Sequence, residues 1–205
     1  MKRLLFLLML IPIIGLGQKN AEYYMDEGMF CFFSENYECA IENYTKSIEN
    51  GMNLYGSRGN AKLRSEDYTG AIADFNKAIE LNPDKGDYFL RGLAKDGLED
   101  YQGAINDYTK AIELNPDYAD AYYSRAGAKK DLKDYQGAIT DYTKAIELNP
   151  DDAYAYYFRG ISKDGLLGIQ LIATENKDYS GVRADLERAC ELGLEKACEA
   201  YKEYK

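Results

Sequence analysis

Three stretches of the chain have almost the same sequence, and they constrain its fold more than any other feature. They read DYTGAIADFNKAIELNPD, DYQGAINDYTKAIELNPD and DYQGAITDYTKAIELNPD, and they close with Pro83, Pro116 and Pro150. The repeat length is therefore 33 and then 34 residues. A repeat of this length is typical of helical solenoids, in which each helix pair is too small to bury its own apolar face. The sequence thus predicts stacked helix pairs with an extended surface rather than an enclosed catalytic pocket.

Within each repeat, small and aromatic residues recur at helical spacing. The second half of one unit carries Ala104, Tyr108 and Ala111, and its neighbours carry the same residue types at the same places. Spacings of four and three residues put such side chains on one face of a helix. The Asn-Pro pair then ends that helix, because proline cannot continue it and holds the preceding residue extended.

This order of aromatic, small and proline residues resembles the tetratricopeptide repeat (TPR). The resemblance extends from about Ala21 to Leu192 and is most specific in the three central units. It implies an all-α, right-handed solenoid of about five helix pairs plus a C-terminal capping helix. The fifth pair departs from the pattern through an insertion from Gly168 to Lys177. The expected units are residues 21–51, 52–84, 85–118, 119–152 and 153–193, with the capping helix at 194–204.

The N-terminal residues have the pattern of a secretory signal peptide. Lys2 and Arg3 precede an apolar run from Leu4 to Ile14, and the small residues Gly15 and Gly17 follow. We expect residues 1–17 to be removed and residues 18–205 to form an exported protein, periplasmic or secreted. The alternative is an uncleaved anchor. Because the run is short for a hydrocarbon core of ~30 Å, we expect no stable membrane insertion once the signal is removed.

The four cysteines form two pairs with the same spacing, Cys31/Cys39 and Cys190/Cys198. A helix break near the middle of each pair would bring two antiparallel helices side by side at matched heights. In an exported protein such pairs are more often disulfides than free thiols. Of the three possible connectivities we expect the local one, whereas a shared metal site would require both ends of a long array to meet. The segment RACELGLEKAC also resembles the cysteine-rich, disulfide-stapled Sel1-like relatives of the TPR.

Composition argues against several classes of function. The formal net charge is −10, which disfavours nucleic acid and anionic lipid surfaces and favours solubility and a basic partner. The chain has no His, the commonest general base and a common zinc ligand. Gly-rich phosphate loops and Ser-Lys nucleophile motifs are also missing. We therefore expect no enzyme, no catalytic residues, no metal site and no cofactor.

Two rows of charged residues recur from unit to unit. One row consists of arginines and the other of aspartates. Each Arg stands at a place where TPR proteins usually pack a Leu, so the structural interpretation is that it forms a buried ion pair with an Asp of the other row. The functional alternative is a ladder of arginines that binds a regularly spaced anionic ligand. The rows are Arg58, Arg91, Arg125 and Arg159, and Asp74, Asp107, Asp141 and Asp185.

The family resemblance also implies a binding surface, because TPR proteins hold extended peptides along the inner face of the first helix of each unit. We therefore expect an exported protein–protein interaction scaffold that binds a protein or peptide segment, with aromatic residues for affinity and acidic residues for orientation. One alternative is a structural component of a cell-envelope assembly that docks through its edges and the insertion. Another is a hydrolase of cell-wall or antibiotic type, suggested by the cysteine-rich relatives. The residues expected to line the groove are Asn60, Phe89, Leu93, Asp96, Asp120, Tyr123, Tyr157, Ile161 and Asp164.

Overall fold

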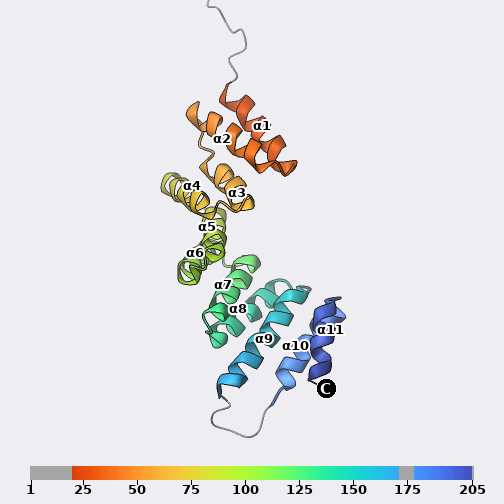
Figure 1. Cartoon of the computed structure of the whole chain (residues 1–205). Coiled ribbons are helices and arrows are strands. Elements are labelled where there is room, and N and C mark those ends of the chain that lie inside the picture. Colours follow the sequence, from red (N-terminus) through yellow and green to blue (C-terminus); the bar gives the residue numbers. More distant parts are fainter. Residues whose placement is uncertain (1–19, 171–177, 205) are drawn as a thin grey trace, which may run out of the picture. The chain divides into compact units, whose positions relative to one another are not determined.

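The computed structural model describes residues 20–170 and 178–204, and within these ranges it is all-helical, with no strand (Figure 1). The predicted signal peptide and residues 171–177 of the predicted insertion lie outside the described residues. The helices of the described ranges are α1 Ala21–Phe33, α2 Tyr37–Glu49, α3 Tyr55–Arg64, α4 Tyr68–Leu81, α5 Lys85–Gly97, α6 Tyr101–Leu114, α7 Ala119–Asp131, α8 Tyr135–Leu148, α9 Ala153–Gln170, α10 Ser180–Glu191 and α11 Glu195–Glu203. The predicted all-α fold of consecutive helix pairs is confirmed.

The chain divides into two compact units, one ending at Leu54 and one beginning at Tyr55. The N-terminal unit contains α1 and α2, which pack on each other. The main unit contains α3 to α11. Its odd-numbered helices from α3 to α9 are the first helices of their pairs, called A helices below, and α4, α6, α8 and α10 are the B helices.

The same N-cap interaction starts three of the B helices. Asp67, Asp100 and Asp134 each accept a hydrogen bond from the backbone N–H three residues later, at 2.9–3.0 Å. A side chain in this position satisfies one of the free N–H groups of the first helical turn. The residue just before each Asp has a φ between 61° and 64°, in the left-handed region, which turns the chain from one helix into the next.

Proline ends two of these helices as predicted. Asn82 and Asn115, which precede Pro83 and Pro116, have extended backbones with φ of −158° and −144°. This conformation is the one that a following proline favours. The chain therefore leaves α4 and α6 at repeat-equivalent places and enters the next A helix.

The core of the main unit is shared between neighbouring pairs. Phe75 of α4 packs with Ala94 of α5, and Tyr108 of α6 packs with Ala128 of α7. Both aromatic side chains are fully buried, between the A helix of their own pair and that of the following pair. Each pair thus completes its apolar face against the next one, as expected for a repeat array.

The A helices of the main unit form a continuous layer. Each A helix packs on its own B helix, α5, α7 and α9 also pack on the preceding B helix, and α3, α5, α7 and α9 contact one another in sequence. Among the described residues, contacts between successive B helices are at most marginal. The A helices are therefore the more closely spaced side of the array. The surface of α3, α5, α7 and α9 that carries the nine predicted groove residues is called the A-helix face below.

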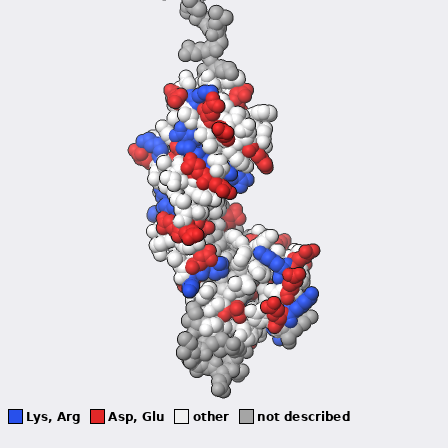
Figure 2. Space-filling view, in the orientation of Figure 1, with Lys and Arg blue, Asp and Glu red and all other residues white. Residues whose placement is uncertain are grey.

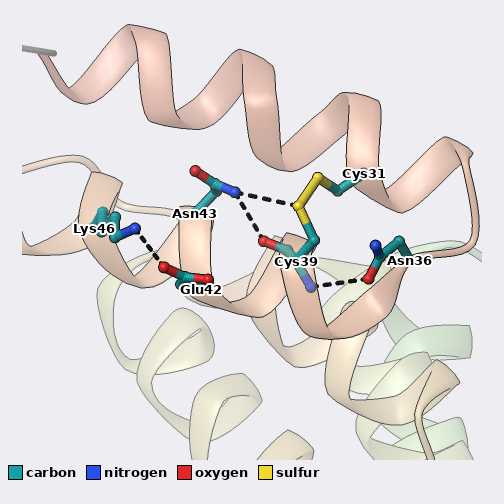
Figure 3. The surroundings of a disulfide bond; sticks show 6 residues. All are labelled: Cys31, Asn36, Cys39, Glu42, Asn43 and Lys46. Carbon is teal, nitrogen blue, oxygen red and sulfur yellow. Dashed lines mark hydrogen bonds and ion pairs between the residues drawn. A yellow bond between two sulfur atoms is a disulfide. The ribbon is translucent and has the colours of Figure 1, made fainter.

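Both predicted disulfides are present. Cys31–Cys39 joins α1 to α2, and Cys190–Cys198 joins α10 to α11. Figure 3 shows the first bridge between its two helices, where the side-chain amide of Asn43 donates to the Cys39 carbonyl at 3.0 Å and to its sulfur at 3.4 Å. Asn36 caps α2 by accepting from the Cys39 N–H at 3.1 Å. The bridges therefore staple the first and the last helix of the described chain to their neighbours.

Candidate functional site

The Arg and Asp rows of the main unit form buried ionic groups. Arg91 donates through Nε and Nη2 to both carboxylate oxygens of Asp107, at 2.8 and 2.5 Å, and Lys95 reaches the same carboxylate at 2.8 Å. Asp107 is only 3% exposed, and its hydrogen bond raises the pKa of Arg91. The same three-residue group recurs as Arg58/Lys62/Asp74, Arg125/Lys129/Asp141 and Arg159/Lys163/Asp185.

The lysines of these groups are a feature that the sequence analysis missed. Each follows its arginine by four residues, so both side chains lie on one helix face and converge on one carboxylate. The Arg-x-x-x-Lys spacing in four successive units was the available signal. Two cations around one buried carboxylate explain how so much charge is tolerated inside the array.

The arginines also join neighbouring pairs. The guanidinium of Arg125 donates to Thr109 of the preceding B helix at 3.0 Å, and Arg159 donates to Thr143 in the same way at 3.1 Å. Each of the four guanidinium groups lies 5.4–5.5 Å from the ring of the tyrosine three residues earlier. These contacts favour the structural interpretation of the arginine row over the anionic-ligand alternative.

On α5, the predicted groove residues are partly buried in contacts between helices. The ring centroid of Phe89 lies 5.7 Å from that of Tyr108 and 5.0 Å from that of Tyr118. Leu93 packs against the same core cluster as Phe89. These two side chains therefore stabilise the stacking of α5 on its neighbours, whatever they contact outside the chain.

The predicted residues of α7 and α9 have similar surroundings. The Tyr123 ring lies 5.6 Å from that of Tyr142, and burial, with a contribution from Asp152, raises the pKa of Tyr123 to about 12. Tyr157 packs edge-on against Phe158 at 5.2 Å. Asp120 is exposed in the first turn of α7, whereas Asn60 on α3 and Ile161 on α9 are half-buried. The structure thus brings the nine residues to one layer of helices but in separate groups.

Asp96 is the most unusual of the predicted residues. Its Oδ1 atom is buried and has no hydrogen-bond partner among the described residues, and the same is true of the Tyr108 hydroxyl. Burial, and then the charge of Asp131, raises the pKa of Asp96. Burial, followed by the nearby charge of Asp96, also raises the pKa of Tyr108.

The C-terminal helix contributes to the A-helix face at α9, which the sequence analysis did not foresee. The Lys196 ammonium of α11 lies 4.8, 4.6 and 5.0 Å from the ring centroids of Tyr154, Tyr157 and Phe158. These distances are those of cation–π contacts. Tyr204 lies beside Asp164, whose hydrogen bond helps burial to raise the pKa of that tyrosine to about 12.

The remaining surface offers little specialised chemistry. On the face that Figure 2 shows, acidic and basic side chains are interspersed, with no large basic patch. A cavity of about 300 Å³ between α9 and α10 is lined by Lys163, Asp178 and mostly apolar neighbours. Within residues 20–170 and 178–204, no three His, Cys, Asp or Glu side chains are grouped to hold a metal ion. No helix in these ranges is long and apolar enough to cross a membrane.

Sequence comparison finds TPR units in the main unit of the structure. A family model described as tetratricopeptide repeat matches residues 53–85 and 119–152, and one described as TPR repeat matches residues 98–132. A protein SGT1 homolog from Oryza sativa subsp. japonica is 44% identical over 55 residues, which cover 25% of this chain and 15% of that protein. The resemblance of the C-terminal end to Sel1-like relatives stays a prediction.

Solved structures with the same fold cover nearly the whole chain. A structure of MamA is 25% identical, has a TM-score of 0.73, and is matched over 85% of this chain and 98% of its own. A MamA structure from Desulfovibrio magneticus RS-1 is 20% identical, with a TM-score of 0.73 over 87% of this chain and 97% of its own. YrrB, described as a TPR protein with an unusual peptide-binding site, is 20% identical, with a TM-score of 0.70 over 91% of this chain and 94% of its own. The chain therefore contains tetratricopeptide repeats and has the solenoid fold of TPR proteins.

Proposed function

We propose that this protein is an interaction scaffold that binds an extended segment of another protein along the A-helix face. The observation that carries the proposal is the composition of that face, where α5, α7 and α9 present aromatic rings together with Asp96, Asp120 and Asp164. Rings supply contact area at low conformational cost, and carboxylates orient a ligand. A likeness to a peptide-binding TPR protein supports the same class of function.

The charge of the chain favours a basic partner. The net charge is −10, and the four arginines of the repeated groups already face buried carboxylates. The cations of the array are thus largely committed to its own stability. An approaching segment rich in Lys or Arg gains from long-range attraction, whereas an acidic segment is repelled.

Site-specific cross-linking tests where a ligand binds. Peptides are selected from a displayed random library on the purified full chain. A photo-reactive phenylalanine analogue at Asp120, exposed on α7, should then cross-link to the selected peptides. The same analogue at Gln136, exposed on α8, is the control and should not. Cross-linking from Gln136 without Asp120 would place the binding surface on the B helices and contradict the proposal.

Export is a further part of the proposed function. Two disulfides within short helical hairpins suit an oxidising compartment and agree with the signal peptide predicted at residues 1–17. Cell fractionation followed by sequencing of the protein's N-terminus tests this part. A cytoplasmic protein that keeps Met1 and four reduced cysteines would contradict it.

A second candidate function is docking into a larger cell-envelope assembly. The specific observation is an exposed apolar surface on α1, where Phe30 is 71% and Phe33 is 79% exposed. Two such phenylalanines on one short helix favour burial against a partner. Changing both to Ser should leave peptide selection unchanged but abolish incorporation into an envelope complex, as judged by native gel migration.

A further inference from the structure

We propose that Asp96 and Tyr108 form a recognition site for a lysine side chain of the bound segment. The partly exposed Asp96 would receive the ammonium group, and the buried Tyr108 would lie behind it. This inference rests on the proposed function, because it assigns a partner chemistry to one place on the A-helix face.

Two buried polar atoms in this region lack hydrogen-bond partners among the described residues. Tyr108 is 0% exposed, and its hydroxyl has no partner of normal hydrogen-bond geometry among the described residues, although Ser124 lies nearby. Asp96 Oδ1 is also buried and unpaired in the described structure. Buried polar atoms in native proteins are nearly always paired, and each unpaired one carries a substantial cost in free energy. A ligand that donates N–H groups to the Asp96 carboxylate would supply hydrogen bonds that the described chain does not provide.

Asp96 and Tyr108 come from two helices that pack closely on each other. The Tyr108 ring lies so close to Gly92 that a Cβ atom there would be 2.5 Å from it. Asp96 follows Gly92 by one helical turn and is therefore on the same side of α5. Asp96 and the Tyr108 ring thus lie on the same side of α5, and the charge of Asp96 acts on the buried Tyr108.

The charge around Asp96 comes from residues of the next A helix. The charged groups that act on Asp96 are Asp131 and Lys130 of α7, and the Lys130 ammonium pairs with Asp131. Two carboxylates thus share one cation. Addition of a second cation would balance the charge and relieve the repulsion that disfavours ionised Asp96.

A later repeat carries an equivalent set of residues on α9. Phe89, Leu93 and Asp96 correspond to Tyr157, Ile161 and Asp164, which follow 68 residues later. At this later place the chain's own helix α11 covers the A-helix face. Lys196 lies among the aromatic rings, and Tyr204 contacts Asp164. A lysine thus lies on Tyr157, the repeat equivalent of Phe89, and a hydroxyl lies beside Asp164, the repeat equivalent of Asp96.

The intermediate repeat completes the comparison. Lys130 stands in α7 at the place of Asp96 in α5, and this lysine is itself the cation there. In α9, Tyr204 lies beside Asp164. In α7, the equivalent residue is Lys130, whose side chain is itself an amine. Among these three repeats of the described chain, α5 presents an acid whose buried oxygen lacks a donor.

Two matched peptides test the inference on the purified full chain. One is an acetylated, amidated pentapeptide with a central lysine between alanines, and the other replaces that lysine by norleucine, which keeps the aliphatic stem without the charge. Binding is followed by NMR through the backbone amides and the side-chain carboxyl carbons. We expect the lysine peptide to shift the signals of Asp96, Tyr108 and Gly92 and to lower the pKa of Asp96. The norleucine peptide should bind about tenfold more weakly, the factor expected for loss of a charged hydrogen bond.

A variant and its control separate a local role from a general charge effect. Asp96→Asn should remove the preference for lysine over norleucine. Glu113→Gln removes one negative charge from the exposed surface of α6 and should keep the preference. Melting curves establish that both variants fold. The titration of Asp96 is followed in the unchanged protein, so this measurement does not depend on the folding of a variant.

The outcomes distinguish this inference from the proposed function. If both peptides shift the signals of α5 and α7 equally and the Asp96 titration does not move, the A-helix face binds peptides but the lysine site is wrong. If both peptides shift signals of α6 and α8 instead, both proposals are wrong. A lysine preference that persists in Asp96→Asn would also overturn the site.

Discussion

At the scale of single residues, the stability of the array depends on charges placed where a TPR usually has apolar packing. Asp107 lies almost fully inside the protein between Arg91 and Lys95. A buried carboxylate is tolerated only while its partners remain, because the interior solvates charge poorly. Exposed pairs such as Lys110–Glu113 on α6 contribute far less, because water screens them.

Replacement of Asp107 by Asn should strongly destabilise the fold. The change leaves Arg91 and Lys95 without their shared anion, and loss of one partner of a buried ion pair costs about 3–5 kcal/mol. Urea unfolding followed by circular dichroism measures the effect. The control is Glu113→Gln, which should cost less than about 1 kcal/mol. Equal losses for the two variants would show that the buried groups are not energetically special.

Asp96 predicts a dependence of stability on pH. Its pKa in the folded protein is raised above the ordinary value of 3.8, so the folded state binds the proton more tightly than the unfolded state does. Ionisation of Asp96 therefore lowers the free energy of unfolding, and this loss is complete once pH has risen through the pKa of Asp96 in the folded protein. Asp96→Asn should be more stable than the unchanged protein at pH 7, and this gain should disappear below pH 3.8. A gain independent of pH would contradict the assignment.

At the scale of helices, small residues set how closely each A helix approaches its B helix. Gly92 of α5 lies directly against the Tyr108 ring of α6. In α7 the repeat-equivalent residue is Ala126, so the repeat pattern alone does not require glycine here. The distance between α5 and α6 therefore determines how large a side chain fits at position 92.

Gly92→Ala should therefore destabilise the protein in spite of alanine's higher helix propensity. A Cβ atom at 2.5 Å from the ring forces the helices apart, and such overpacking costs about 1–3 kcal/mol. Gly168→Ala on α9 is the control, because nothing lies within 4 Å of the added atom. It should gain about 0.5–1 kcal/mol from propensity. The difference in urea midpoint between the two variants tests the expectation, and a gain for Gly92→Ala would refute it.

The C-terminal helix depends on its bridge. Cys190–Cys198 closes a short loop between α10 and α11 and holds Lys196 near the rings of α9. Changing both cysteines to Ser should cost roughly 2–3 kcal/mol by the chain-entropy estimate. Hydrogen exchange should then rise in α11 first, because the bridge is the covalent link that holds this helix against α10. Unchanged exchange in α11 would mean that packing alone holds the helix.

At the scale of the whole molecule, stability and charge follow from repetition. In the main unit, each pair is stabilised by the pair beside it, so a local change weakens its neighbours before it affects distant pairs. The repeated ionic groups bury four carboxylates, while the other acidic residues leave the chain with a net charge of −10. This excess charge acts on any partner at long range.

The affinity for a basic peptide should therefore depend on salt. Screening shortens the reach of the surface charge, with a Debye length of about 10 Å at 0.1 M and about 3 Å at 1 M. We expect calorimetry to show weaker binding of a lysine-containing peptide as salt rises, mainly through slower association. The norleucine twin serves as the control and should change little. Equal salt dependence for both peptides would argue against an electrostatic contribution.

Much of the fold follows directly from the sequence, because its determinants are local. Helix ends depend on residues within one turn, such as Asp100 before α6 and the Asn115-Pro116 pair after it. Both disulfides span eight residues, so the spacing of the cysteines and one helix break were enough to predict the pairing. The buried stripe of Ala104, Tyr108 and Ala111 likewise follows from helical periodicity.

The candidate site depended on packing between helices, which periodicity does not encode. The sequence placed Phe89, Tyr123 and Asp96 on one face but did not distinguish them. Only the tertiary structure shows that the two rings pack into the array while Asp96 has an unpaired, buried oxygen. The contact of Lys196 with the rings of α9 arises because α10 and a disulfide return the chain to that surface. The repeated sequence thus determined the array of helix pairs. The burial of individual polar atoms depends on several helices at once, so only the tertiary structure decided it.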